Sequence, residues 1–138
     1  MSYGLEVDMI AKAHAKDLLT TPYIFNEAEA AAMTKAGADV IVCHLGLTTG
    51  GSIGADTALK LAACPALVDK WAAAARKVRN DVIVLVHGGP VAEPQDAEFI
   101  MKNTELCQGF YGASSMERLP TEVALTAQTR KFKAIRGR

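Results

Sequence analysis

The chain lacks the features that would mark a secreted, membrane-embedded or disulfide-stabilised protein. Its 138 residues include three cysteines, an odd number without close paired spacing. This argues against a disulfide framework and against a zinc site, and it favours a reducing compartment. No charged segment followed by an apolar one opens the sequence, and no apolar run approaches the roughly 20 residues that span a bilayer. We therefore expect a cytoplasmic protein without a signal peptide and without a membrane partner.

The chain also has no excess of positive or negative charge. Lys plus Arg and Asp plus Glu number 15 each, so no overall field favours nucleic acid or an acidic surface. The C-terminus alone is locally basic, and we interpret its cations as complementing the dipole of a last helix rather than as an RNA-binding tail. These cations are Arg130, Lys131, Lys133, Arg136 and Arg138.

Apolar residues, by contrast, make up half of the chain, which is enough for a hydrophobic core. We expect one domain over residues 1–138. Its pattern is that of four consecutive strand–helix units after a first helix over residues 4–16. The strands are expected at 17–23, 39–44, 81–87 and 107–112. The second and third are continuous apolar runs, which are typical of parallel strands covered on both faces.

Capping signals mark the helices between these strands. Asn26 and Glu29 form a variant of the capping box, and Gly37 is placed just past the end of that helix. Pro94 suits the first position of another helix, and Thr121 is expected to cap the last. An apolar stripe predicts that the helix after the second strand packs on the core. The stripe consists of Leu67, Trp71, Ala74, Ala75 and Val78.

Two units echo each other at a spacing of 42 residues: Ala38-Asp39-Val40-Ile41-Val42 and Asn80-Asp81-Val82-Ile83-Val84. Each begins a strand that ends on a histidine followed closely by glycine. Alternating strands and helices predict a parallel sheet with right-handed crossovers, hence an α/β fold. The pattern alone does not separate a barrel wall from an open doubly wound sheet.

Four motifs decide between these alternatives. They are Thr20-Thr21-Pro22-Tyr23, His44-Leu45-Gly46-Leu47-Thr48-Thr49-Gly50-Gly51, His87-Gly88-Gly89-Pro90 and the segment from Gly109 to Pro120. They resemble a family of TIM-barrel signal-transduction or phosphoenolpyruvate hydrolase-like proteins, some labelled phosphonopyruvate hydrolase. A related barrel occurs in a plant antiviral resistance protein that binds viral replication proteins.

The resemblance covers the chain from about Gly4 to Ile135 and implies four parallel βα units, the C-terminal half of a (β/α)8 TIM barrel. A complete barrel needs roughly 250 residues. We therefore expect a homo-oligomer, or association with a separate N-terminal half-barrel.

The resemblance also implies a small phosphorylated or phosphonate oxo-acid as ligand and phosphoenolpyruvate hydrolase-like chemistry, of hydrolase or lyase type. A non-catalytic signal-transduction or protein-binding barrel is the alternative. The cofactor stays unknown: Mg²⁺ is suggested by family analogy only, no metal site is visible, and any ligands are expected in the other half.

In such a barrel the functional face is built from the loops that follow the strands. Gly88, Gly89, Ser114 and Ser115 could cradle an anion with backbone N–H groups and hydroxyls, although the glycines could equally serve tight turns. The loop segment Thr48-Thr49-Gly50-Gly51-Ser52 suits a mobile lid over a ligand or a plain connection, and it is not a P-loop.

The candidates for proton transfer are His44, His87 and Glu117. Counted from Asp39 and Asp81, the two histidines stand five and six residues on, so regular alternation predicts that they face opposite sides of the sheet. Arg118 could clamp a carboxylate, or it could brace the loop against a neighbouring helix. Thr20 and Thr21 are also expected at the mouth.

Overall fold

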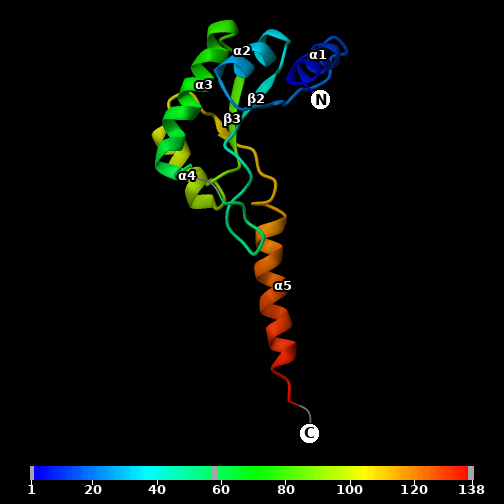
Figure 1. Ribbon diagram of the computed structural model, residues 1–138, viewed down its shortest axis with the longest axis vertical. Coiled ribbons are helices and arrows are strands. Elements are labelled where there is room, and N and C mark those ends of the chain that lie inside the picture. The colour runs from blue at the N-terminus through cyan, green and yellow to red at the C-terminus, as the bar shows by residue number, and fades with distance from the viewer. Residues whose placement is uncertain (1, 57–58, 137–138) are drawn as a thin grey trace.

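The computed structural model describes residues 2–56 and 59–136. Its helices are α1 (Tyr3–His14), α2 (Glu27–Lys35), α3 (Cys64–Val78), α4 (Pro94–Asn103) and α5 (Arg118–Lys133), with a 3-10 turn, η1 (Leu61–Ala63), before α3. Its strands are β1 (Tyr23–Ile24), β2 (Val40–His44), β3 (Ile83–His87) and β4 (Gly109–Phe110). Strand and helix alternate along the chain (Figure 1), as the apolar pattern predicts.

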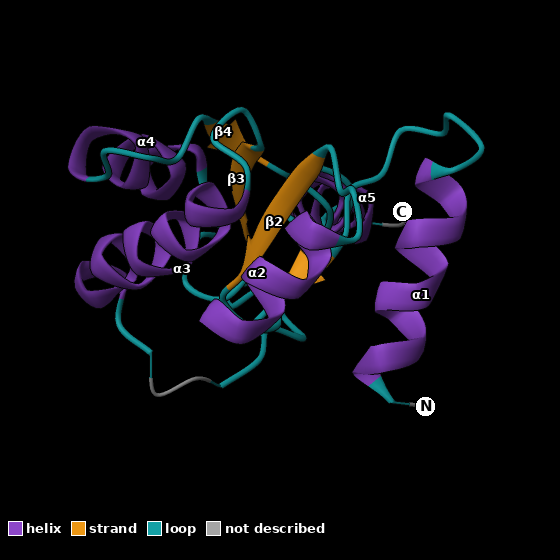
Figure 2. Ribbon diagram, turned by 90° about the horizontal axis from the view of Figure 1, so that it is seen from above, coloured by secondary structure: helices purple, strands orange, loops and turns teal. Residues whose placement is uncertain are grey.

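The four strands form one parallel sheet in the order β1-β2-β3-β4, which is their order in the chain. The central pair runs from Val40 opposite Ile83 to His44 opposite His87. A doubly wound sheet reverses its strand order and carries helices on both faces. Here the order never reverses, and α2, α3 and α4 pack beside one another on one layer (Figure 2). The fold is therefore α/β with the arrangement of half a (β/α)8 barrel.

The core lies between this helical layer and one face of the sheet. Ile41 and Cys43 of β2 and Val84 and Val86 of β3 pack there against buried residues of the helices. Those helical residues include Met33, Val68, Trp71 and Ile100. Because side chains alternate along a strand, the opposite face carries Tyr23, Val42, His44, Leu85 and His87. We call this second face the inner face, because it would line the interior of a complete barrel.

The predicted first strand was wrong in its bounds. Asp17 has a left-handed backbone, and residues 20–22 lie beside β2 without forming the expected strand over 17–23. Thr20 donates its hydroxyl to an Asp39 carboxylate oxygen at 2.9 Å and its N–H to the same oxygen at 2.8 Å. Asp39 precedes β2, so Thr20 lies at the entry of the strands and not at the mouth.

The capping signals were right at two helices and wrong at the third. The Asn26 side chain accepts a hydrogen bond from the Glu29 N–H at 2.9 Å, and α4 begins at Pro94. Thr121, however, lies inside α5. The turn before it already makes helical bonds, such as Glu117 N–H to the Ala113 carbonyl, so α5 begins at Arg118. The Thr121 hydroxyl donates instead to the Glu117 carbonyl.

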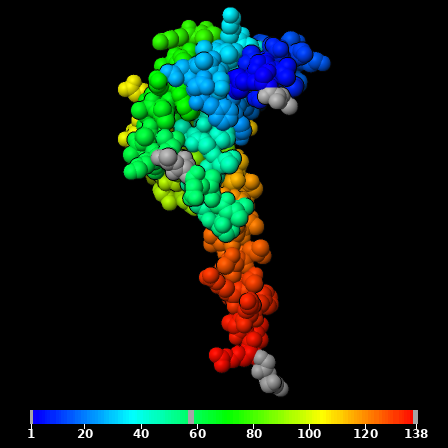
Figure 3. Space-filling view, viewed as in Figure 1, coloured from blue at the N-terminus to red at the C-terminus, as the bar shows by residue number. Residues whose placement is uncertain are grey.

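The apolar residues of α3 and of α5 have different environments. In α3, Trp71 and Ala75 are buried as predicted, whereas Val78 is exposed. Helix α5 projects from the rest of the molecule (Figures 1 and 3) with the expected basic residues in its last turn. Of its residues, all of which the structure describes, Leu119 alone is buried. Large exposed apolar side chains follow along the projection, namely Val123, Leu125, Phe132 and, just past the helix, Ile135.

Candidate functional site

His44 and His87 lie side by side at the carboxyl ends of β2 and β3. The ladder pairs them directly, and their ring centroids are 4.8 Å apart. The prediction that they face opposite sides was wrong, because it aligned the two strands on Asp39 and Asp81. The ladder pairs Val40 with Ile83 instead, which shifts the alignment by one residue and brings both histidines to the inner face.

Two tyrosines complete a cluster around the histidines. Tyr23 of β1 stacks on His87 at 5.0 Å with 15° between the rings, and it meets the His44 ring edge-on at 4.8 Å. Tyr111, just after β4, lies edge-on to Tyr23 at 6.1 Å and to His87 at 6.2 Å. We call Tyr23, His44, His87 and Tyr111 the histidine–tyrosine cluster. Phe25 packs on its His44 side, with centroids 5.0 Å apart. One residue thus comes from each of the four strands or their exits.

Main-chain groups bond to both imidazoles. The Gly46 N–H donates to His44 Nδ1 at 3.1 Å, and His87 Nδ1 lies 2.6 Å from the Tyr111 carbonyl oxygen. The Tyr111 hydroxyl is also 3.4 Å from that of Thr21. Among the mouth residues named from the sequence, Thr21 is therefore joined to the cluster, unlike Thr20.

The electrostatics of the cluster favour a neutral His44 ring. Burial, and to a lesser extent the neighbouring His87, lowers the pKa of His44 below its ordinary value. Burial and the neighbouring Tyr111 raise the pKa of Tyr23. At neutral pH both His44 and Tyr23 are therefore neutral hydrogen-bonding groups.

The glycine loops after β2 and β3 are tied to each other. Gly89 donates its N–H to the Gly46 carbonyl at 2.7 Å, and Thr49 donates to the Gly89 carbonyl at 3.0 Å. Gly88 and Gly89 both have left-handed backbones. A Cβ at Gly88 would stand 2.3 Å from the Gly46 oxygen. Close packing of the two loops already requires glycine there, and the role of Gly88 and Gly89 in anion binding stays a prediction.

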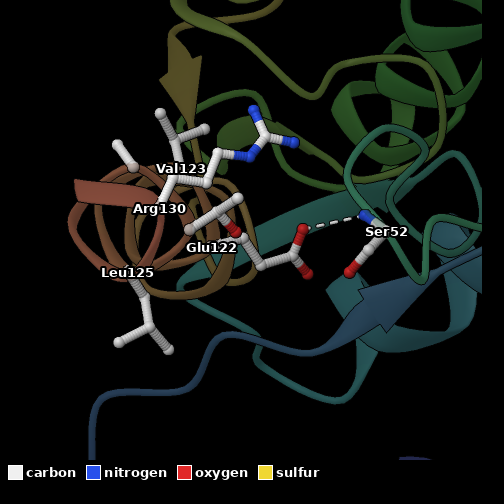
Figure 4. A pocket seen from close by; sticks show the side chains of 7 residues that line it. Ser52, Glu122, Val123, Leu125 and Arg130 are labelled. Carbon is white, nitrogen blue, oxygen red and sulfur yellow. Dashed lines mark hydrogen bonds between the residues drawn. The ribbon is translucent and has the colours of Figure 1, made fainter. Parts of the chain in front are cut away.

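The loop that contains Gly50, Gly51 and Ser52 is tied by hydrogen bonds to two α5 residues, Arg118 and Glu122, which form an ion pair within the helix. Arg118 Nη1 lies 2.8 Å from Glu122 Oε1, and its guanidinium also reaches the Gly50 carbonyl at 3.4 Å. Ser52 donates its N–H to Glu122 Oε2 at 2.8 Å (Figure 4). The Ser52 N–H, followed by Arg118, lowers the pKa of Glu122. Arg118 thus acts as a brace between loop and helix in this structure, and a ligand role for it stays a prediction.

The remaining predicted residues lie in the turn that leads into α5. Ser114 accepts main-chain bonds from Arg118 and Leu119, and Ser115 follows it. Glu117 is exposed at the N-cap of α5, outside the histidine–tyrosine cluster. An open hollow of about 620 Å³ between Ser52 and the outer part of α5 is lined by Glu122, Val123, Leu125 and Arg130, among others (Figure 4). It is a separate feature from the cluster.

No group of three His, Cys, Asp or Glu side chains that could hold a metal ion occurs within residues 2–56 and 59–136. Within those ranges, none of the helices combines the length and the apolar character that a membrane span requires. Sequence reasoning missed Tyr23, Phe25 and Tyr111 as site residues. The signal was available, since an aromatic residue stands at the exits of the first and fourth strands just as a histidine stands at the exits of the second and third.

The sequence matches the family described as phosphoenolpyruvate hydrolase-like over residues 1–135, and the chain belongs to this family. Two similar proteins come from Solanum lycopersicum: the ToMV susceptible protein tm-1(GCR26) and the ToMV resistance protein Tm-1(GCR237). Each is 55% identical over 135 residues, which is 98% of this chain but 18% of the relative. The chain therefore spans about a fifth of the length of these relatives.

Among solved structures, a FabK mutant from Thermotoga maritima aligns with a TM-score of 0.48 at 20% identity. The alignment covers 75% of this chain and 31% of that one.

Proposed function

We propose that the inner face at the strand ends binds a small phosphorylated or phosphonate oxo-acid. The observation that carries the proposal is the pairing of His44 and His87 in direct register, with centroids 4.8 Å apart at the carboxyl ends of two parallel strands. That edge is where barrels of this architecture bind substrates. Two adjacent imidazoles supply hydrogen bonds and a proton acceptor to an acid whose charge changes in a reaction.

The proposed reaction is hydrolysis of the phosphoester or carbon–phosphorus bond of that acid, in keeping with the family description. In this proposal His44 and His87 handle protons, and the backbone of Gly88 and Gly89 with Ser114 and Ser115 holds the anionic group. Thr48 to Ser52 cover the ligand, and Arg118 would have to leave Glu122 to reach it. We place this chemistry in the cytoplasm. The described residues offer no cluster of three side chains that could hold Mg²⁺, so that ion would need ligands from elsewhere.

We further propose that a second half-barrel closes over the inner face. The outer edges of β1 and β4 are unpaired within the described sheet, and Ile83 on the inner face is 42% exposed. Because the strands are parallel and ordered, β1 of a second copy beside β4 would continue the same order. A separate N-terminal half-barrel would do so equally. Light scattering after size-exclusion chromatography, with and without phosphoenolpyruvate, tests this: a monomer indifferent to ligand would contradict closure by a second copy.

The binding proposal is tested by titrating the full chain with phosphoenolpyruvate and with phosphonopyruvate in a calorimeter. His87→Ala should abolish the heat of binding while circular dichroism shows an intact fold. His14→Ala, on the exposed end of α1, is the matched control and should bind as the unaltered chain does. Binding that survives His87→Ala would contradict the placement of the site.

A non-catalytic, protein-binding barrel is the second candidate, and the exposed apolar side chains along α5 favour it. The hollow beside Ser52 adds Arg130 and Glu122 to this surface. The two candidates separate experimentally, because Leu125→Lys should weaken partner binding without affecting the titration with oxo-acids. His87→Ala should have the reverse effect.

A further inference from the structure

We propose that the main chain holds His44 and His87 in opposite neutral tautomers, so that His87 is the proton acceptor of the site and His44 a permanent hydrogen-bond donor. The ligand class in this inference rests on the function proposed above, whereas the tautomers follow from hydrogen bonds alone.

The His44 tautomer is set by Gly46. A backbone N–H can only donate, so the bond of 3.1 Å from Gly46 to His44 Nδ1 requires a lone pair on that nitrogen. The single proton of the neutral ring is therefore on Nε2. A second proton on Nδ1 would point at the Gly46 N–H and break the bond, so the ring is held neutral as well as oriented.

The His87 tautomer is set by Tyr111 in the opposite sense. A carbonyl oxygen can only accept, so the contact of 2.6 Å requires the proton on His87 Nδ1. The lone pair of the neutral ring is therefore on Nε2. This ring can take up a second proton there while it keeps its bond to Tyr111, which makes it the member of the pair that can become a cation.

Main-chain bonds hold both of these partners in place. Gly46 accepts from the Gly89 N–H at 2.7 Å, and Leu45 donates to the His87 carbonyl at 2.9 Å. Tyr111 donates its own N–H to the Val86 carbonyl at 2.8 Å. The tautomer of each ring is thus determined by the sheet and its loops rather than by a mobile side chain.

The groups packed around the pair do not reverse this assignment. From β1, Tyr23 stacks on His87, and from the exit of β4, Tyr111 lies edge-on to it. Both are phenols that are neutral at the pH at which imidazoles titrate. Two imidazolium rings at 4.8 Å would repel each other, so the first proton taken up blocks the second.

One donor and one acceptor at adjacent positions suit a ligand with an oxo or enol oxygen beside an acidic proton. The oxygen accepts from His44 Nε2–H. His87 Nε2 takes the acidic proton of the ligand, and the electron pair of the broken bond becomes negative charge on that oxygen, which the His44 hydrogen bond stabilises. A fully deprotonated phosphonate group would meet the His87 lone pair unfavourably. The oxo-acid end of the ligand, not its phosphorus group, should therefore face the pair.

The test is long-range ¹H–¹⁵N spectroscopy of the full chain labelled with ¹⁵N-histidine, first without ligand. We expect Nδ1 of His44 and Nε2 of His87 to give signals of unprotonated nitrogen, and the other two to give signals of protonated nitrogen. His14→Asn, His44→Asn and His87→Asn assign the signals. The same tautomer in both rings would overturn the inference.

Repeating the spectra with saturating phosphonopyruvate separates this inference from the proposed function. If the tautomers are opposite and neither ring responds to the acid, the assignment stands and the proposed ligand class fails. If both rings respond but share one tautomer, the ligand class stands and the division of roles between the histidines fails.

Discussion

Helices α3 and α5 have almost the same length, 15 and 16 residues, and opposite environments. Six residues of α3 are buried against the sheet and α2. In α5, by contrast, Leu119 is buried and the rest of the helix projects from the molecule (Figure 1). Both carry apolar residues and basic last turns. Composition therefore indicates a helix in each case, but only packing against a layer decides whether its apolar residues stabilise this chain or are available to another.

Replacing Trp71 by Ala should have the largest effect of any change that probes this contrast. Trp71 is 8% exposed in the core between α3 and the sheet. Truncating a buried tryptophan costs about 3–5 kcal/mol of unfolding free energy. The matched change Phe132→Ala in α5, where the ring is 65% exposed, should stay within about 0.5 kcal/mol. Urea denaturation followed by circular dichroism measures both, and similar losses would show that α5 is packed in solution.

Gly88→Ala should have the next largest effect, because Gly88 lies where the loops that follow His44 and His87 pack against each other. The new Cβ would meet the Gly46 carbonyl oxygen, and alanine disfavours the left-handed backbone at this position. We expect a loss of about 2–3 kcal/mol in thermal unfolding experiments. Gly4→Ala is the control: it lies in α1, where a Cβ would make only an ordinary contact with Ser2 Oγ at 3.9 Å, and it should be neutral or stabilising by up to about 1 kcal/mol. An unchanged Gly88→Ala protein would show that the two loops are not tightly packed.

Asp39→Asn should have a smaller effect that depends on pH. The Thr20 N–H and hydroxyl lower the pKa of Asp39 in the folded chain, so the carboxylate stabilises the fold above its unfolded pKa. That stabilisation is lost as pH falls through the lower folded pKa. We expect a cost of about 1 kcal/mol at pH 7, which disappears in acid. Parallel denaturation curves at pH 7 and at about pH 3 measure it. A difference that is constant with pH would contradict the proposed bond.

The smallest effect is expected where the loop that contains Ser52 contacts helix α5. Glu122→Gln removes the charge that pairs with Arg118, and ion pairs near a surface contribute little to global stability because solvent screens them. Global stability should barely change, but the Ser52 amide, which donates to Glu122, should exchange its hydrogen faster. Lys102→Gln, which breaks the exposed pair with Glu98, is the control and should leave Ser52 unaffected.

The sequence was a good guide where one local signal dominates. Asn26 and Pro94 begin helices for reasons within one turn of chain, and the apolar runs of β2 and β3 allow little besides buried parallel strands. The parallel direction of the strands follows from their alternation with helices. These features need no information about distant partners.

The register of the strands and the exposure of side chains could not be predicted from the sequence. Whether His44 faces His87 depends on a ladder that pairs Val40 with Ile83, one residue away from the alignment that the repeated Asp suggests. Thr20 was misplaced because its bond to Asp39, 19 residues away, holds it at the strand entry. The sequence does not distinguish an Arg118 that binds a ligand from one that pairs with Glu122, as it does in this structure. Each of these outcomes depends on a contact between distant segments.

The short edge strands have a consequence for assembly. β1 and β4 each contribute two residues to the sheet, against five in β2 and β3. Main-chain bonds at either edge can therefore hold a neighbouring segment only weakly, and closure would depend on side chains of the inner face. Closure by a second copy would then obey mass action, and the melting temperature of the assembled barrel would rise with protein concentration. Closure by a segment covalently joined to this one would be independent of dilution.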